Sequence, residues 1–464
     1  MHFIKKTEKK FKSLLKIRRS NHQELLENLR VEEASQFYFA CRNGDIDTVK
    51  QILPTIPYDQ LNQLEPNGST ALHVATYFGH VDIVRLLLHE YGCQRNLQDR
   101  HGFTAYEKVQ TDEMRQLYDR PSNENRFNDD SMDIKQIFEI LSSSINKIII
   151  GDRDDDDDVA KPNKRYLIDY ETNEEVKNQL DNINSAKVFF QSRIGRYIMG
   201  QRMKLKLGKK DDYDEEEYAY VTSEKFRQES LQKTLDEYVT SNHPDYQHCC
   251  HLLNEYIQQG TIESLLKLYT LETPFYHKLL LWPSLLEFPL LMHLSDLKQR
   301  YYQGYSYRGV QLTQHELNEY RWALKNKDSV LSLLTFASTS INRNVAEQFS
   351  TKSSSSSDKL SVLLIFHFSQ PCDTAINLSK IPVYQLPCIS NFENEQEVLI
   401  SPRTFFKVTD IEIDQPYEQY TIYLENVCGE QQTMLKALKF FLPDGLTKKT
   451  SKCFVMDHVF CTNN

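Results

Sequence analysis

The feature that most constrains the fold of this chain is a stretch of sequence near its beginning that recurs about every 34 residues. Residues 68–75 (GSTALHVA) are followed by residues 79–88 (GHVDIVRLLL). The first text restarts at residues 102–105 (GFTA), and residues 41–53 (CRNGDIDTVKQIL) contain an earlier copy of the second. A repeat of this length is typical of short helical units that stack and bury apolar faces between them.

The text of the repeat resembles ankyrin repeats, and local physical chemistry agrees with the resemblance. Thr70 suits a helix N-cap because its hydroxyl can accept a backbone N–H of the first turn. Gly79 suits the left-handed turn that ends a helix. Only one copy of the repeat is complete, and a stable stack usually needs about three repeats. We therefore expect a short module that packs against neighbouring helices. Its expected function is to dock a protein partner, and a purely structural helical cap is the alternative.

Composition narrows the class of protein. The chain has 464 residues, 40% of them hydrophobic, which suits two or three domains with real cores. Its 55 Lys and Arg against 65 Asp and Glu give a net charge of −10, so nucleic acid is not an expected partner. No run of about 18 apolar residues occurs, so we expect no transmembrane segment. The nine cysteines lack the spacing of a disulfide framework, which favours reduced thiols and a cytoplasmic location.

Shifts in composition divide the chain. The first residues place Lys and Arg around apolar positions, as in an amphipathic arm that touches anionic lipid or a partner, or in a solvated helix end. The aspartate run at 154–158 indicates a solvated loop rather than a calcium site, because it lacks the glycine and the alternation of an EF-hand. The expected parts are a basic arm (1–30), an ankyrin-like module (31–120), an acidic linker and connecting segment (121–223), a second domain (224–430) and a C-terminal tail (431–464).

The second domain begins with helical spacing and continues with strands. Apolar residues recur at helical intervals over residues 224–299, whereas residues 361–368, 397–400 and 420–424 have the β-branched and aromatic content of strands. Helices followed by strands indicate an α+β domain. No glycine-rich dinucleotide fingerprint follows a strand. Residues 248–251 (HCCH) are not expected to bind a metal, because adjacent side chains on a helix point around its whole circumference.

Three short motifs occur in order in the strand-rich part. Residues 307–309 (YRG) come first, residues 336–340 (FASTS) second, and residues 395–397 (EQE) third, directly before the strand-like text VLI. Each motif alone is weak, since a pair of nearby glutamates arises often by chance in an acidic chain. In this order, with each motif next to a strand, the combination is specific.

The three motifs together resemble the arginine-type mono-ADP-ribosyltransferases, whose signature is an Arg, then Ser-Thr-Ser, then Glu-x-Glu. The resemblance covers about residues 268–410 and includes residues 269–276 (YTLETPFY) ahead of the first motif. It implies a helical part packed on a mixed β-sandwich, with a cleft between them. It also implies transfer of ADP-ribose from NAD to a protein arginine, with release of nicotinamide and without a metal; NADP as the donor stays open.

The resemblance assigns roles to the motif residues. Cleavage of the nicotinamide–ribose bond develops positive charge on the ribose, which a fixed carboxylate stabilises; by the resemblance, Glu397 is that carboxylate. Arg308 would bind the pyrophosphate with its planar fork, and Gly309 would allow close approach to the nicotinamide amide. Ser338 would bond the nicotinamide ribose or order Glu397.

Glu395 is expected to receive the acceptor. Side chains two apart in a strand face the same side, so an extended segment would open Glu395 and Glu397 into one cleft. There Glu395 could accept hydrogen bonds from an incoming guanidinium, and in the family a carboxylate at this position goes with arginine as the acceptor. Phe392 matches an aromatic residue that contacts the protein substrate, and Phe349 matches a ring that lies against nicotinamide.

Simpler interpretations stay open from the sequence. Arg308 could be a structural ion-pair partner, Glu395 and Glu397 could be the solvated face of an edge strand, and Phe392 and Phe349 could be packing residues. Two rival functions also remain. One is an enzyme that passes ADP-ribose mainly to water or a small guanidine, acting as an NAD glycohydrolase. The other is a catalytically silent NAD- or protein-binding scaffold that works through its ankyrin-like module.

Overall fold

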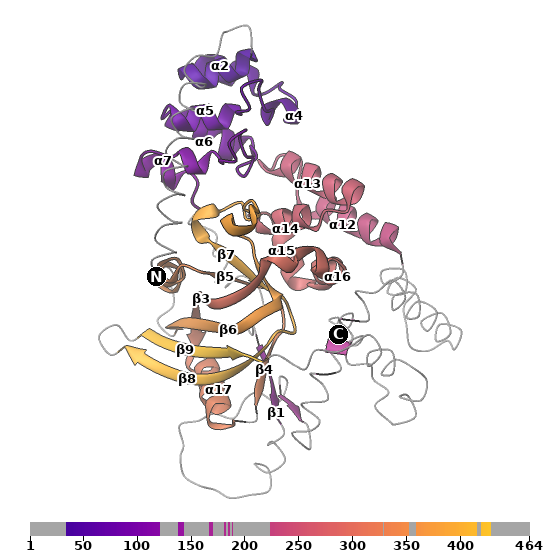
Figure 1. The fold of residues 1–464 in the computed structure, drawn as a ribbon, viewed down its shortest axis with the longest axis vertical. Helices are drawn as coiled ribbons and strands as arrows, with labels where there is room; N and C mark the ends of the chain where they lie inside the picture. Colours follow the sequence, from indigo (N-terminus) through magenta and orange to yellow (C-terminus); the bar gives the residue numbers. More distant parts are fainter. Residues whose placement is uncertain are drawn as a thin grey trace, which may run out of the picture.

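The structure, a computed structural model, describes most of the chain in seven segments: residues 34–120, 138–142, 167–169, 223–327, 329–351, 359–414 and 419–427, with a few single residues between 181 and 188. The basic arm, the aspartate run and the C-terminal tail lie outside the described residues. A stack of short helices occupies one end of the molecule, with a second group of helices and a β-sheet beyond it (Figure 1). We call residues 34–120 the N-terminal module.

Several helices of the N-terminal module begin at side-chain caps. The hydroxyls of Ser35, Thr70 and Thr111 each accept the backbone N–H of the residue three positions further on. Gly79 has φ of +80°, and the backbone N–H of His80 returns to the carbonyl of Ala75, which ends the central helix. Both sequence predictions, the Thr70 cap and the Gly79 turn, are therefore confirmed. The elements are α2 (Gln36–Asn43), α3 (Ile46–Ile52), α4 (Tyr58–Leu61), α5 (Ala71–Tyr77), α6 (Val81–Arg85), the π-helical turn η2 (Leu86–Glu90), the 3-10 turn η3 (Tyr106–Lys108) and α7 (Asp112–Gln116).

The module has its own apolar core. Its largest buried side chains come from α2, α5, α6 and η2, where they recur at helical spacing and face the neighbouring helices. This core includes Tyr38, Leu72, Val74, Ile83, Val84, Leu87 and Leu88. The apolar side chains Ile83, Val84, Leu87 and Leu88 of the second helix of the repeat are thus buried between stacked helices.

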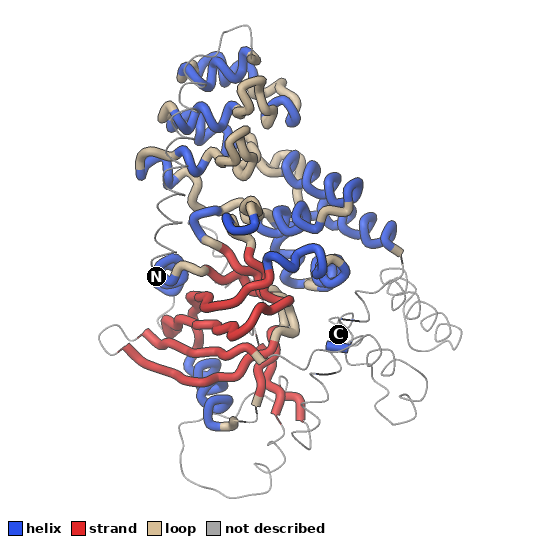
Figure 2. The backbone as a smooth tube through the Cα atoms, viewed as in Figure 1, coloured by secondary structure: helices blue, strands red, loops and turns tan. Residues whose placement is uncertain are grey.

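A second group of helices covers one side of the strands. Its elements are α12 (Glu224–Tyr238), α13 (Tyr246–Gln259), α14 (Ile262–Thr270), α15 (Pro274–Leu281), α16 (Ser284–Met292) and the 3-10 segment η4 (Leu294–Arg300). The helical spacing predicted over residues 224–299 is confirmed. The apolar core of these helices continues into the sheet, where it includes Phe336, Ile376 and Leu399. Figure 2 shows most of the helices above the strands, with helix also at the lower end of the sheet.

The strands form one hydrogen-bonded sheet in the order β2-β1-β4-β8-β9-β6-β3-β5-β7. Their bounds are β1 (Phe138–Ser142), β2 (Leu167–Asp169), β3 (Tyr301–Thr313), β4 (Val330–Leu333), β5 (Ala337–Ser340), β6 (Lys359–Asn377), β7 (Glu397–Ile400), β8 (Phe405–Asp414) and β9 (Gln419–Asn426). The strands predicted from the sequence at 361–368, 397–400 and 420–424 correspond to β6, β7 and β9. Helix α17 (Gln314–Lys325) packs on β8 and β3, and α18 (Arg343–Thr351) packs on β3, β5 and β6.

The long strand β6 closes part of the sheet on itself. It pairs with β3 along most of its length and with β9 over its first half, and its last residues, Ala375 to Asn377, also pair with β7. Strands β6, β3, β5 and β7 therefore form a closed, barrel-like ring in which β7 is bonded on both sides. The pairing β6–β9 is parallel and most others are antiparallel, so the sheet is mixed, as expected. The domain is helical and β-rich, and the expected sandwich arrangement stays a prediction.

Residues from the expected connecting segment also belong to the sheet. Strand β1 pairs with β4, and β2 pairs with β1. Phe138 of β1 is buried against the rings of Tyr320, Phe366 and Phe406. The segment 121–223 is thus not only a linker, because a short apolar part of it completes the core of the following domain. Among the described helices, none combines the length and the apolar character needed to cross a membrane.

Candidate active site

The three sequence motifs lie on neighbouring strands. Arg308 is in β3, Ser338 in β5, and Glu397 is the first residue of β7. Strand β5 lies between the other two: Ser340 is opposite Tyr307 of β3 and also opposite Glu397 of β7. Motifs that are far apart in the chain therefore meet in one small part of the ring, which the order of motifs alone could not establish.

The Glu397 carboxylate is buried and held at both oxygens. Its exposed fraction is 0%, and Ser338 Oγ donates to Oε1 at 2.6 Å while Ser390 Oγ donates to Oε2 at 2.8 Å. Ser338 reaches it because diagonal neighbours on one face of an antiparallel pair approach closely. Tyr269 of α14 places its hydroxyl 3.4 Å from Ser338 Oγ. Hydroxyl donors of this kind compensate for the loss of water around a buried carboxylate.

The first motif also contacts the second. Arg308 is half-buried, and its Nη1 donates to the backbone carbonyl of Ser338 at 2.8 Å. Thr339 Oγ1 donates to the carbonyl of Val398 at 2.9 Å, and Ser340 Oγ donates to the carbonyl of Glu395. The Ser-Thr-Ser motif therefore holds β7 and the turn before it in place.

The backbone around Glu395 differs from the expectation. Glu395 does not lie in a strand but ends the 3-10 turn η6 (Glu393–Glu395), and Gln396 follows in the left-handed region with φ of +48°. The rule that residues two apart share a face of a strand therefore does not apply to Glu395 and Glu397. Glu395 is 3% exposed, so it does not open into a solvent-filled cleft. The alternative of a solvated edge strand is also wrong, because both carboxylates are buried and β7 is paired on both sides.

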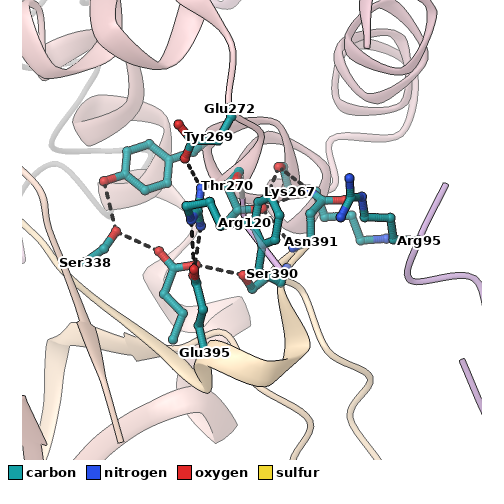
Figure 3. Close-up of polar contacts among 12 residues, drawn as sticks. Arg95, Arg120, Lys267, Tyr269, Thr270, Glu272, Ser338, Ser390, Asn391 and Glu395 are labelled. Atoms are coloured by element: carbon teal, nitrogen blue, oxygen red, sulfur yellow. Dashed lines mark hydrogen bonds and ion pairs between the residues drawn. The ribbon is translucent and has the colours of Figure 1, made fainter. Parts of the chain in front are cut away.

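Glu395 is paired with an arginine of the N-terminal module. Arg120 donates from Nε to Oε1 and from Nη2 to Oε2 of Glu395, each at 2.8 Å. Its Nη1 donates to the carboxylate of Glu272, and the carbonyl of Thr270 lies 3.5 Å from the same nitrogen. Figure 3 shows the Arg120 side chain directed at Glu395, with Tyr269 and Thr270 at the end of α14 and Glu272 just after it nearby. The guanidinium is thus enclosed by two carboxylates and a carbonyl.

Two arginines of the module cover the ring of Phe392. The guanidinium carbon of Arg120 lies 3.9 Å from the ring centroid, and that of Arg95 lies 5.0 Å from it. Burial lowers the pKa of Arg95 from its usual value. Phe392 is 3% exposed, so the ring that the sequence assigns to a protein substrate contacts the protein's own arginines. The side chain of Phe349, in α18, lies outside the described residues.

The turn that carries Phe392 and Glu395 is fastened to the end of α14. Asn391 donates from Nδ2 to the carbonyl of Lys267 at 2.9 Å and to Thr270 Oγ1 at 2.8 Å, and its backbone N–H donates to the same hydroxyl at 3.1 Å. These bonds fix the spacing between the α14 end and η6. The α14 end and η6, which lie on the two sides of the Arg120 guanidinium, are therefore held in one relative position.

Several residues of the site were not predicted to act there. Ser390 belongs to no motif, and its position seven residues before Glu397 gives no periodic signal. Tyr269 and Glu272 lie in the text that supports the family resemblance, but that text does not tell what they touch. Arg120 stands before a proline at the end of the helical module, and nothing in its local sequence indicates a partner 275 residues away.

Metal-binding groups do not gather in the described part of the chain. Within it, no three His, Cys, Asp or Glu side chains lie close enough together to hold an ion. His248 is buried in α13 and its ring stacks on Tyr58 of the N-terminal module. Burial lowers the pKa of His248 to about 3, so the ring stays neutral in this contact. The cysteines at 41, 93, 249, 250, 372 and 388 are free thiols.

Comparison with known families confirms the repeat. The family described as Ankyrin repeats (3 copies) matches residues 10–107. A curated relative, the NAD-capped RNA hydrolase NUDT12 of Homo sapiens, is 38% identical over 78 residues, which make up 17% of this chain. That match lies in the ankyrin region, and the chain spans only 16% of the relative's length.

Solved structures similar to this chain include ADP-ribosyltransferases. The ADP-ribosyltransferase Vis of Vibrio splendidus is 19% identical, with a TM-score of 0.22 over 44% of this chain and 86% of its own. The type III effector XopAI of Xanthomonas axonopodis pv. citri is 16% identical, with a TM-score of 0.30 over 50% of this chain and 96% of its own. ADP-ribosyltransferase HopU1 of Pseudomonas syringae is 11% identical, with a TM-score of 0.27 over 42% and 87%. Similarity at this level carries no argument about function, so what the comparisons establish is the ankyrin repeats of the N-terminal region.

Proposed function

We propose that this chain transfers ADP-ribose from NAD to the guanidinium of a protein arginine and releases nicotinamide. One observation carries the proposal: a fully buried carboxylate, Glu397, is held at both oxygens by Ser338 and Ser390, and Glu395 beside it in sequence already binds a guanidinium. Glu397 is thus a fixed carboxylate of the kind that stabilises positive charge on a ribose. Glu395 already binds a guanidinium, which is the group that an arginine acceptor would present.

The reaction assigns a task to each acid. The bond between ribose C1 and the nicotinamide nitrogen breaks, and its electron pair leaves with nicotinamide. Glu397 stabilises the positive charge that develops on the ribose. A guanidinium nitrogen forms the new bond to C1 and gives up one proton, which Glu395 can accept before it passes to solvent. Fixed donors around Glu397 matter because a carboxylate that need not reorganise acts most strongly in the transition state.

The other motif residues suit the donor molecule. Arg308 offers a planar set of N–H donors for a pyrophosphate and lies on the strand next to Ser338. Gly309 follows it in the same strand, without a side chain to obstruct the donor. NAD is the proposed donor, and NADP stays an alternative. Neither the proposed chemistry nor these residue types require a metal.

The proposal extends to partners and location. Ankyrin repeats commonly present a protein-binding surface, so the N-terminal module would bind the protein whose arginine is modified, or a partner that brings it. The net charge of −10 argues against nucleic acid as that partner. Free thiols throughout the described residues suit a reducing compartment such as the cytoplasm.

One rival function is favoured by a specific observation. Since Glu395 is already paired with Arg120, an incoming guanidinium has no free carboxylate to bind, whereas water needs none. NAD glycohydrolysis at the same site is therefore the second candidate. A silent scaffold is disfavoured by the intact set Arg308, Ser338 and Glu397.

The test is incubation with NAD labelled on its adenylate side, with and without a saturating guanidine such as agmatine. We expect nicotinamide release that falls about 10²–10³-fold in Glu397→Gln, and no change in the matched variant Glu412→Gln, an exposed acid on β8. Label on agmatine supports transfer, whereas label only on free ADP-ribose supports the glycohydrolase. Absence of nicotinamide release in every variant would leave the scaffold.

A further inference from the structure

The acceptor side of the site contains an arginine of the chain itself. Arg120 ends the N-terminal module, and its side chain is 2% exposed between Glu395 at 3% and Glu272 at 7%. We infer that Arg120 is an internal pseudosubstrate: it fills a guanidinium-binding subsite built from Glu395, Glu272 and the Phe392 ring, and an acceptor arginine must displace it. This inference rests on the proposed function and adds Glu272 to the residues that select the acceptor.

The contacts around Arg120 are those that a guanidinium site requires. The fork of Nε and Nη2 meets both oxygens of Glu395 in the bidentate geometry that arginine alone can offer. Glu272 binds the third nitrogen, and the Phe392 ring lies 3.9 Å from the guanidinium carbon. Two carboxylates and an aromatic face would accept the planar guanidinium of any arginine but would suit the compact ammonium of lysine poorly.

Arg120 is bound as an inhibitor rather than as an acceptor. Attack on ribose C1 needs a guanidinium nitrogen directed at that carbon. Each of the three nitrogens of Arg120 already donates to Glu395 or Glu272, and Nη1 is also near the Thr270 carbonyl. Modification of Arg120 would require these bonds to break. The bound form therefore excludes other guanidinium groups without itself being positioned for transfer.

Neighbouring contacts keep Arg120 in the subsite. The preceding residue, Asp119, accepts from Asn394 Nδ2 at 2.9 Å, next to Glu395. Further away, Lys380 Nζ lies 2.8 Å from Oε1 and 2.9 Å from Oε2 of Glu107 in the module. Because the module and the subsite belong to one chain, Arg120 competes at a high effective concentration. Release of the module would free Glu395 and Glu272 for an external arginine.

The experiment measures the partition of ADP-ribose between agmatine and water in the full-length protein. We expect Arg120→Ala to raise the ratio of agmatine label to free ADP-ribose about tenfold or more, and to lower the agmatine concentration needed for half-maximal transfer. The matched control Arg115→Ala removes a half-exposed arginine from the same module and should leave the ratio unchanged. In the Arg120→Ala background, Glu272→Gln should raise the half-maximal agmatine concentration again.

Two further variants keep the inference testable if Arg120→Ala does not fold. Arg120→Lys retains a cation without the fork, and Lys380→Ala weakens module docking away from the subsite; both should raise the ratio, by less than Arg120→Ala. An unchanged ratio in all folded variants, with Glu397-dependent nicotinamide release intact, overturns the pseudosubstrate but not the proposed function. ADP-ribose found on Arg120 by mass spectrometry also overturns it. No nicotinamide release in any variant overturns both.

Discussion

The guanidinium of Arg120 donates two hydrogen bonds of 2.8 Å to the two carboxylate oxygens of Glu395, which lies 275 residues further along the chain. This pair joins the N-terminal module to the turn before β7. Both side chains are almost completely buried, at 2% and 3% exposure. The contact therefore couples the docking of the module to the state of the proposed acceptor carboxylate.

Removing both partners of this pair should cost less stability than the sum of the two single substitutions. Arg120→Ala leaves two buried carboxylates without their cation, so we expect the free energy of unfolding to fall by about 3–5 kcal/mol. Arg120→Ala combined with Glu395→Gln removes much of that uncompensated charge, and the double variant should be less destabilised than the sum of the singles. Denaturant unfolding of the four proteins measures this coupling; additive effects would contradict a direct interaction.

The two serines that bind Glu397 should each contribute to nicotinamide release. Ser338→Ala or Ser390→Ala removes one charge-assisted hydrogen bond, worth about 1.5–3 kcal/mol, so we expect kcat to fall about tenfold or more. The loss should appear in kcat more than in KM, because each serine orients the acid rather than binding the donor as a whole. Ser369→Ala, at an exposed position of β6, is the control. Equal rates in all three variants would show that Glu397 needs no such support.

Glu393 should make the stability of the folded protein dependent on pH. Burial is the main cause that raises the pKa of Glu393 to about 7; nearby Glu107 raises it further, while Thr104 and Lys380 lower it. The folded protein thus binds a proton that the unfolded chain has lost between about pH 4.5 and 7, so the free energy of unfolding falls as pH rises through this window. The total is about 3 kcal/mol.

Glu393→Gln tests this dependence. The glutamine cannot ionise, so the variant should lose less stability between pH 5 and pH 8 than the parent protein, and should be the more stable of the two at pH 8. Thermal unfolding at both pH values gives the comparison. The same difference between the two pH values in both proteins would show that Glu393 is not the group responsible.

Gly92 should tolerate a side chain less well than Gly79. Both glycines have positive φ, at +55° and +80°, so alanine at either position costs about 1–2 kcal/mol of backbone strain. At Gly92 an added Cβ would also lie 2.4 Å from the carbonyl oxygen of Pro244, whereas nothing lies within 4 Å at Gly79. Gly92→Ala should therefore lower the melting temperature more than Gly79→Ala, and equal shifts would contradict close packing between the module and the α12–α13 connection.

Local structure was predictable where neighbours in the sequence decide it. Thr70 caps a helix and Gly79 ends one because both effects involve residues within one turn. The strands β6, β7 and β9 follow from runs of β-branched and aromatic residues. The ankyrin repeats follow from a period, since a repeated text implies a repeated unit.

The prediction that Glu395 and Glu397 share one face of a strand used only local sequence, and it was wrong. Alternation along a strand requires extended backbone, and the left-handed Gln396 interrupts it just between the two acids. The sequence predicted that two carboxylates act together but could not show that one of them ends a 3-10 turn. Ser390 was missed because a hydrogen bond to Glu397 needs a specific loop path rather than a pattern.

By itself, the sequence determined the repeated helical module, the change from helices to strands and the order of three motifs, because each depends on residue type and short-range spacing. Only the tertiary structure decided that Arg308, Ser338 and Glu397 meet on adjacent strands, and that Arg120 pairs with Glu395. The physical reason is that a buried ion pair forms between groups that the whole fold brings within 3 Å of each other. The residues next to Arg120 and next to Glu395 in the sequence do not indicate that these two side chains pair.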